Sequence, residues 1–168
     1  MMRKSLFFFL FSLVIVIGLD QAVKYWVMHN IPLGTAIPIL PFLSLYHVHN
    51  SGIAFSFFSS FSHWGLIILT LIIIVALLWI RKNTECNKSL SRFGLTIIIG
   101  GAIGNFIDRI RFHYVIDYIL FYIDDIFYFA VFNLADSFIT IGAIAIIIEE
   151  LLIWVWAKKE HHSSTLSG

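Results

Sequence analysis

Long apolar runs, separated by shorter stretches that hold most of the polar residues, dominate the pattern along the chain. A helix needs roughly 17–25 residues to cross a hydrocarbon core of about 30 Å. Four runs have this length, at about residues 5–28, 64–80, 93–110 and 132–156. The second run carries no charge and has a tryptophan near each end, which is typical of a span that meets the headgroups. The pattern therefore predicts four transmembrane helices.

The first run also resembles a secretory signal, because Arg3 and Lys4 precede its apolar residues. A cleaved signal ends in a small-x-small pattern. That pattern is lacking here, and the apolar character resumes after Asp20. We therefore predict that the first run is an uncleaved transmembrane helix.

Composition favours an integral membrane protein. Of the 168 residues, 60% are hydrophobic and 12% are charged, with a mean hydropathy of +0.92. A soluble domain carries roughly 25% charged residues. The net charge of +1, without a basic cluster, gives no indication of a nucleic-acid partner. The single cysteine, Cys86, excludes an intrachain disulfide framework. Without internal repeats or a flexible linker, we expect one domain over residues 1–168.

Lysine and arginine positions predict the orientation in the membrane. These residues occur at both termini and in residues 81–92, whereas residues 29–63 contain none and residues 111–131 contain only Arg111. Cytoplasmic loops carry the excess of such residues. Both termini and residues 81–92 are therefore expected to be cytoplasmic, and the two remaining connections face outward.

The two outward connections have patterns of their own. Residues 42–49 alternate with a period of about two and lead into the turn-like "NSG", which predicts a short strand and a turn. Residues 112–132 hold nine aromatic residues, a density typical of a segment at headgroup level. The predicted fold is thus an all-α membrane protein with four transmembrane helices, a small outward β element and an interfacial segment.

Apart from Glu149 and Glu150 near the inner end of the fourth run, the acidic, amide and basic side chains in or beside the spans gather at the outward leaflet. They are Asp20 and Lys24 in the first run, Asn105, Asp108 and Arg109 in the third, Asn133 and Asp136 in the fourth, and Asn50 and Asp117 in the connections. Ionisable groups within a membrane are costly and usually functional. The alternative to a functional role is that these residues lie at helix ends that meet water, where Asp136 would interact with the helix dipole.

Gly100 and Gly104 in the third run form a small-xxx-small pair. Such a pair lets helix backbones approach closely, so we interpret it as a packing feature.

The polar set favours chemistry by carboxylates. The sequence has no G-x-S-x-G elbow or H-E-x-x-H motif, and "HVH" at 47–49 lacks carboxylate ligands at metal spacing, so we predict neither a metal site nor a cofactor. Two close aspartates can share one proton, so that one activates water while the other polarises a carbonyl. Asp117 on a loop and Asp136 at a helix start meet this requirement. The adjacent Asp124 and Asp125 project in different directions and fit it poorly.

The sequence resembles the lipoprotein signal peptidases (signal peptidase II), a bacterial family of four-helix aspartic proteases of the inner membrane. Five stretches carry the resemblance, in the family's order and spacing: "DQAVK" at 20–24, "NSGIAFS" at 50–56, "GGAIGNFIDR" at 100–109, "VIDY" at 115–118 and "FNLADSFI" at 132–139. The family often has alanine where Ile53 stands and phenylalanine where Tyr118 stands, which could alter the shape of the pocket.

The resemblance implies that Asp117 and Asp136 are the catalytic dyad. Positions that help to shape the site would be Asp20, Lys24, Asn50, Gly52, Asn105, Arg109 and Asn133. Among these, Asp20 and Lys24 are expected to brace the first helix and the outward β element. The asparagines and Arg109 are expected to bind the substrate backbone or orient the dyad, and residues 112–132 to act as a lid.

The resemblance also implies the substrate and the location. The substrate would be a prolipoprotein whose cysteine already carries diacylglycerol, cut just before that cysteine. The protein would be a monomer in the lipid of the bacterial inner membrane, with both termini cytoplasmic and residues 29–63 and 111–131 periplasmic. The alternatives are a small proton-coupled transporter that uses the buried aspartates as a relay, and a non-catalytic scaffold. A relay should place ionisable groups at several depths, whereas here they cluster at one leaflet.

Overall fold

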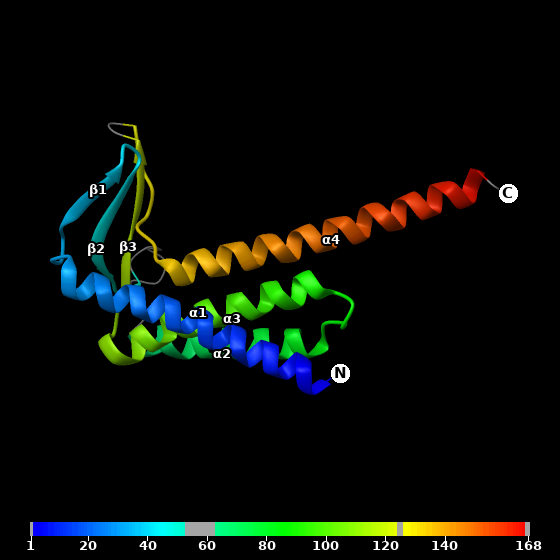
Figure 1. Ribbon diagram of the computed structural model, residues 1–168, viewed down its shortest axis with the longest axis horizontal. Coiled ribbons are helices and arrows are strands. Elements are labelled where there is room, and N and C mark those ends of the chain that lie inside the picture. The colour runs from blue at the N-terminus through cyan, green and yellow to red at the C-terminus, as the bar shows by residue number, and fades with distance from the viewer. Residues whose placement is uncertain (1, 53–62, 124–125, 167–168) are drawn as a thin grey trace.

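The computed structural model of the chain describes residues 2–52, 63–123 and 126–166, with side chains within 6–52, 64–123 and 126–159. Ile53, Asp124 and Asp125 lie outside the described residues. The helices run from an antiparallel sheet at one end of the molecule, and the fourth extends well past the others towards the C-terminus (Figure 1).

The described residues contain four long helices, as the apolar runs predict. They are α1 (Met2–Asn30), α2 (His63–Asn83), α3 (Ser89–Phe112) and α4 (Leu134–Leu166). Each contains a stretch that is long and apolar enough to cross a membrane: Leu6–Asn30, Trp64–Asn83, Ser89–Phe112 and Leu134–Lys159. Most helices extend beyond the predicted bounds. The bounds were predicted from apolar residues, and the terminal turns of these helices carry polar side chains.

Helix α3 is the centre of the helical part and contacts α1, α2 and α4. Its span is far more buried than the other three spans, whose large apolar side chains are mostly exposed. A surrounding lipid phase would cover those side chains without any need for further protein. The arrangement therefore agrees with a multi-pass membrane protein.

Glycines allow α3 to approach its neighbours closely. Gly100 and Gly104 both face α1, against Val16 and Asp20 respectively, which confirms the predicted packing pair. A second close approach joins α3 to α4, where a Cβ atom on Gly94 would lie 2.5 Å from the carbonyl oxygen of Gly142.

The sheet has four antiparallel strands in the order β1 (Ala36–Leu40), β2 (Leu43–Asn50), β3 (Val115–Ile123) and β4 (Phe127–Tyr128). Strand β2 confirms the predicted strand at 42–49. In the register of β2 with β3, Val48 lies opposite Asp117 and Asn50 opposite Val115. The register thus brings the end of the first connection beside the start of the second.

Within residues 112–132, the prediction that Asp117 lies on a loop was wrong. Most of this segment forms β3 and β4, and Asp117 lies in strand β3 and not on a loop. Aromatic and β-branched residues favour strands as well as membrane interfaces. A high density of aromatic residues therefore could not distinguish a strand from an irregular interfacial segment.

The sheet is attached to the ends of two helices. Val27 and Ile31 from the end of α1 form a buried cluster with Ile116 and Tyr118 of β3. Near the start of α4, the Phe132 carbonyl oxygen accepts hydrogen bonds from the backbone N–H groups of Tyr118 and Ile119. Strand β3 therefore has a fixed position relative to both α1 and α4.

A second set of contacts joins the start of α3 to the middle of α4, away from the sheet. The Glu149 carboxylate accepts hydrogen bonds from the backbone N–H groups of Leu90 and Ser91, in the first turn of α3. Glu150 forms a 2.7 Å ion pair with Lys88. Glu149 thus satisfies backbone N–H groups at a helix start that the helix itself cannot satisfy, and Glu150 adds an ion pair beside them.

Gly94→Ala should lower the thermal unfolding midpoint, because the added methyl group collides with the backbone of α4. Overpacking of this kind costs about 1–3 kcal/mol. Gly18→Ala is the matched control, since a Cβ atom there meets no atom within 4 Å. It should leave the midpoint unchanged or slightly higher. Tryptophan fluorescence during heating in detergent measures both, and equal midpoints for the two variants would contradict the close helix contact.

Candidate active site

Two carboxylates, the buried Asp117 and the partly buried Asp136, meet where β3 approaches the start of α4. Asn133, which directly precedes α4, contacts both of them. Its side-chain Nδ2 donates to Asp117 Oδ1 at 2.6 Å, and its backbone N–H donates to Asp136 Oδ2 at 3.1 Å. The Asp136 N–H donates in turn to Asn133 Oδ1 at 3.0 Å, which completes a reciprocal helix cap. One residue thus links the two aspartates.

Two further asparagines bind the remaining carboxylate oxygens. Asn50 Nδ2 donates to Asp117 Oδ2 and Asn105 Nδ2 donates to Asp136 Oδ1, each at 2.8 Å. Every oxygen of both carboxylates therefore accepts a hydrogen bond from an amide N–H. Asn50 is itself held by the Gly52 N–H, which donates to Asn50 Oδ1 at 2.9 Å from a backbone with φ of 94°. A positive φ favours glycine at that position.

The environment of Asp117 makes it suitable for proton transfer. Burial, together with the nearby charge of Asp136, raises the pKa of Asp117 to about 6, although hydrogen bonds from Asn50 and Asn133 oppose the shift. Catalytic groups act best when their pKa lies near the working pH. Asp117 can therefore exchange a proton close to neutral pH.

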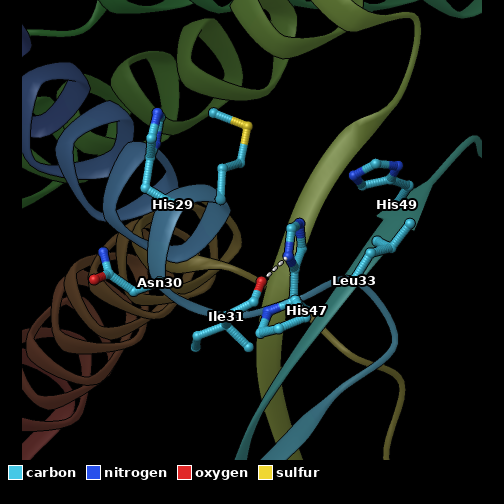
Figure 2. A pocket seen from close by; sticks show the side chains of 8 residues that line it. His29, Asn30, Ile31, Leu33, His47 and His49 are labelled. Carbon is cyan, nitrogen blue, oxygen red and sulfur yellow. Dashed lines mark hydrogen bonds between the residues drawn. The ribbon is translucent and has the colours of Figure 1, made fainter.

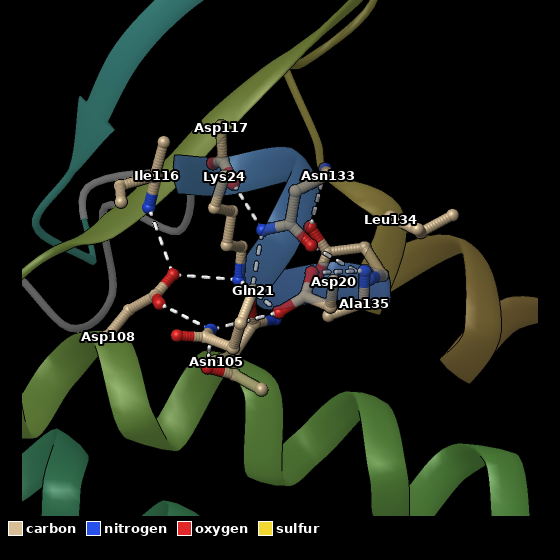
Figure 3. Close-up of polar contacts among 12 residues, drawn as sticks. Asp20, Gln21, Lys24, Asn105, Asp108, Ile116, Asp117, Asn133, Leu134 and Ala135 are labelled. Carbon is tan, nitrogen blue, oxygen red and sulfur yellow. Dashed lines mark hydrogen bonds and ion pairs between the residues drawn. The ribbon is translucent and has the colours of Figure 1, made fainter. Parts of the chain in front are cut away.

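A buried lysine is the centre of a second polar network directly behind the carboxylates (Figure 3). Lys24 Nζ lies 2.9 Å from Asp20 Oδ2 and 2.7 Å from Asp108 Oδ2, and all three side chains are at most 1% exposed. The same ammonium donates to Asn105 Oδ1 at 2.9 Å. Because Lys24 can only donate, it fixes the orientation of the Asn105 amide, and the Nδ2 atom of Asn105 then faces Asp136.

This lysine network also binds the backbone beside each carboxylate. Asp108 Oδ2 accepts from the Ile116 N–H at 3.3 Å, one residue before Asp117. Asp20 Oδ1 accepts from the Ala135 N–H at 3.0 Å, one residue before Asp136. The network therefore positions the two peptide segments that carry the candidate catalytic groups.

Gln21 completes the lysine network, and sequence reasoning did not assign it or Asp108 to the site. Gln21 Nε2 donates to Asp108 Oδ1 at 2.9 Å, to Asp20 Oδ2 at 3.2 Å and to the Gly104 carbonyl oxygen at 3.2 Å. A Cβ atom on Gly104 would collide with the Asp20 carboxylate, so glycine is needed there. Both residues could have been found from the sequence, because Gln21 lies in the stretch "DQAVK" and Asp108 in the stretch "GGAIGNFIDR".

The structure brings most of the predicted site residues together. Asn50, Asn105 and Asn133 contact the carboxylates directly, and Gly52 contacts them through Asn50. Asp20 and Lys24 lie in the network behind. Arg109 lies one turn after Asn105, and its guanidinium donates to the Asn105 carbonyl oxygen at 3.4 Å.

An apolar cavity of about 510 Å³ borders Asp136. Its lining residues come from the sheet, from the connection that follows it and from the first turns of α4: Phe121, Phe127, Phe129, Phe132, Asp136, Ser137, Thr140 and Ile141. A cavity with mainly aromatic walls and one carboxylate can take an apolar chain and place its polar end against Asp136.

Comparison with known proteins decides the family. Residues 12–152 match the family model of signal peptidase (SPase) II. The chain belongs to the signal peptidase II family. The lipoprotein signal peptidase of Bartonella henselae is 77% identical over 159 residues, which cover 95% of this chain and 98% of the relative. That of Brucella ovis is 44% identical over 161 residues, which cover 96% of this chain and all of the relative.

The fold is also similar to that of solved structures. One, described as a bacterial membrane enzyme solved by the in meso method at 2.3 Å resolution, superposes with a TM-score of 0.75 at 32% identity. The match covers 85% of this chain and 87% of the other. The family match and the structural match therefore both cover the helices and the sheet.

Lys24→Met should lower the thermal stability sharply, because it removes the only positive charge in direct contact with the buried Asp20 and Asp108 carboxylates in the described part of the chain. Removal of one partner of a buried ion pair costs about 3–5 kcal/mol. Lys88→Met is the matched control, because the ion pair of Lys88 with Glu150 is largely exposed and should contribute little. Thermal unfolding in detergent compares the two, and a Lys24→Met variant as stable as Lys88→Met would refute this assignment.

Proposed function

We propose that the chain is an aspartic endopeptidase that removes signal peptides from diacylglyceryl-modified prolipoproteins, with cleavage just before the lipidated cysteine. The observation that carries this proposal is the pair Asp117 and Asp136, bridged by Asn133 and bordered by an apolar cavity. Membership of the signal peptidase II family supports the peptidase activity, and the names of the relatives support the substrate class.

The proposed mechanism uses a dyad that holds one proton. The ionised carboxylate takes a proton from a water molecule as the water oxygen attacks the scissile carbonyl carbon. The protonated carboxyl donates a hydrogen bond to the carbonyl oxygen and stabilises the charge that develops there. The carboxyl that took the proton from water then gives it to the leaving nitrogen, the C–N bond breaks, and the pair again holds one proton. Because the two groups are coupled, the proton belongs to the pair and not to one aspartate.

The surrounding residues have supporting roles in this proposal. Asn50, Asn105 and Asn133 orient the carboxylates through the hydrogen bonds described above. Arg109 contributes positive charge beside them, which favours binding of the substrate backbone. The aromatic wall of the cavity excludes water around the scissile bond and accepts the apolar part of the substrate. Phe121 and Phe127 of that wall belong to the segment expected to act as a lid.

The location follows from the substrate. A lipid-modified cysteine lies at a membrane surface, and the candidate site lies at the end of the helices that carries the sheet. We propose the periplasmic leaflet of the bacterial inner membrane, with cytoplasmic termini, from the distribution of lysine and arginine. The catalytic groups all come from one chain, which supports a monomer.

Membership of the signal peptidase II family does not support the alternative function, a proton-coupled transporter. The described polar groups near Asp117 and Asp136 also form one compact network and not a relay across the membrane. The lysine network holds Asp20 and Asp108 by direct ion pairs, so these carboxylates have a structural use.

Asp117→Asn and Asp136→Asn should each lower cleavage by about 10²-fold or more, the usual contribution of a general acid or base. Each substitution keeps the side-chain shape while it removes the carboxylate. The measurement is cleavage of a diacylglyceryl-modified precursor by the purified protein. Glu150→Gln, near the middle of α4 and away from the candidate site, is the matched control and should keep normal turnover. If either aspartate variant retained near-normal turnover, the dyad would be wrong.

Cleavage should also depend on pH in a defined direction. Because the pKa of Asp117 is raised to about 6, the last proton of the dyad leaves near that pH in the free enzyme. Above it, both carboxylates are ionised and no acid remains to polarise the carbonyl. kcat/KM should therefore fall as pH rises past about 6, approaching tenfold per pH unit. A profile that instead rises between pH 6 and 8 would contradict a dyad that needs its shared proton.

A further inference from the structure

Tyr118 contacts the chain on both sides of Asn133, the residue that links the two aspartates. Its backbone N–H donates to the Phe132 carbonyl oxygen at 3.1 Å, directly before Asn133. Its hydroxyl oxygen accepts from the Leu134 N–H at 3.1 Å, directly after Asn133. Tyr118 itself follows Asp117 in β3. One residue of the strand that carries Asp117 therefore fixes the segment that carries Asn133.

The Tyr118 ring is held in the core where α1 ends. Tyr118 is 3% exposed and packs with Val27 and Ile31 of α1. The end of α1 is bound in turn to β2, because His47 Nδ1 lies 2.7 Å from the Ile31 carbonyl oxygen, as Figure 2 shows. A carbonyl oxygen can only accept, so the ring nitrogen donates. The Tyr118 hydroxyl is therefore a fixed acceptor beside the start of α4.

The hydroxyl also completes the set of acceptors at the start of α4. A helix leaves its first N–H groups without partners of its own. The Asp136 N–H donates to the Asn133 side chain, and the Ala135 N–H donates to a carboxylate of the lysine network. The Leu134 N–H is the remaining group of this turn, and Tyr118 accepts from it. The turn that carries Asp136 is thus bound to α1 and to β3 at neighbouring peptide groups.

Tyr118 acts through Asn133 and does not touch the substrate. It is buried and does not line the cavity beside Asp136. Burial raises the pKa of the Tyr118 hydroxyl, so it stays protonated and does not act as a base. The phenylalanine that the family often has here would keep the ring and lose the hydroxyl. The tyrosine therefore adds a hydrogen bond and does not reshape the pocket.

We propose that Tyr118 is a positioning residue that sets the separation of the two carboxylates. Asn133 donates to Asp117 at 2.6 Å from its side chain and to Asp136 at 3.1 Å from its N–H. Both bonds depend on the position of the Asn133 segment, which Tyr118 holds at either side. A small displacement of reacting groups lowers the rate of the chemical step, because these groups must be aligned. Tyr118 has this role only if Asp117 and Asp136 form the proposed dyad.

Tyr118→Phe tests the role of the hydroxyl. The single-turnover rate of cleavage of a diacylglyceryl-modified precursor, at saturating enzyme, should fall about fivefold to tenfold, since one hydrogen bond is lost. The enzyme concentration that gives half the maximal rate should stay the same, because Tyr118 lies outside the cavity wall. Ser44→Ala is the matched control: Ser44 is equally buried, and its hydroxyl donates to the Tyr122 hydroxyl at 3.3 Å in the same sheet. It should leave both quantities unchanged.

Equal single-turnover rates for Tyr118→Phe and the wild-type protein would overturn the proposal. A fall that Ser44→Ala matches, or one with an equal loss of substrate affinity, would also overturn it, because Tyr118 would then have a structural role alone. Asp117→Asn and Asp136→Asn test the dyad separately. If those two variants are inactive while Tyr118→Phe behaves like Ser44→Ala, the proposed function stands and the role of Tyr118 is wrong. If they keep normal turnover, both proposals fail.

Amide hydrogen exchange tests the contact without an assay of activity. In protein with isotope-labelled leucine, nuclear magnetic resonance can follow the exchange of the Leu134 N–H. That N–H should exchange slowly in the wild-type protein and in Ser44→Ala, and about fivefold or more faster in Tyr118→Phe. If the Leu134 N–H of the wild-type protein exchanged at the rate of an unprotected amide, the proposal would be overturned even if Tyr118→Phe did not fold.

Discussion

The buried ion pairs of Lys24 with Asp20 and Asp108 are the constraint on which the rest of the structure depends. Two carboxylates and one ammonium without access to water are stable only if hydrogen bonds satisfy their remaining lone pairs. Here those bonds come from Gln21 and from the backbone N–H groups of Ile116 and Ala135. The electrostatic requirement of the cluster therefore places the residues directly before Asp117 and Asp136.

Packing and electrostatics support each other at this point. Helix α1 can bring Asp20 into the network only because Gly104 of α3 leaves room for its carboxylate. Lys24 in turn fixes the amide of Asn105, which binds Asp136. Polar interactions are strong in a medium of low dielectric constant, and the cost of an unpaired group is equally high. A site held in this way is rigid before any substrate arrives, which electrostatic catalysis requires.

Sequence reasoning predicted the features that follow from local pattern. Hydropathy predicted the four spans, and the placement of polar residues at one leaflet brought Asp117 and Asp136 together as a candidate pair. Strand β3 was missed because its aromatic residues suit both a strand and a membrane interface. The bonds of Asp20 to Ala135 and of Gln21 to Asp108 join residues far apart in the sequence, so no local pattern could reveal them.

The central claim is that Asp117 and Asp136 are coupled closely enough to act as one catalytic pair. Infrared difference spectroscopy can follow the protonated carboxyl band of the pair in the wild-type protein, and that of Asp117 in Asp136→Asn, as pH changes. Burial and the charge of Asp136 raise the pKa of Asp117 to about 6, so loss of that charge should shift its titration to lower pH. A midpoint that does not move in Asp136→Asn would show that the two carboxylates do not share a site, and would contradict the account.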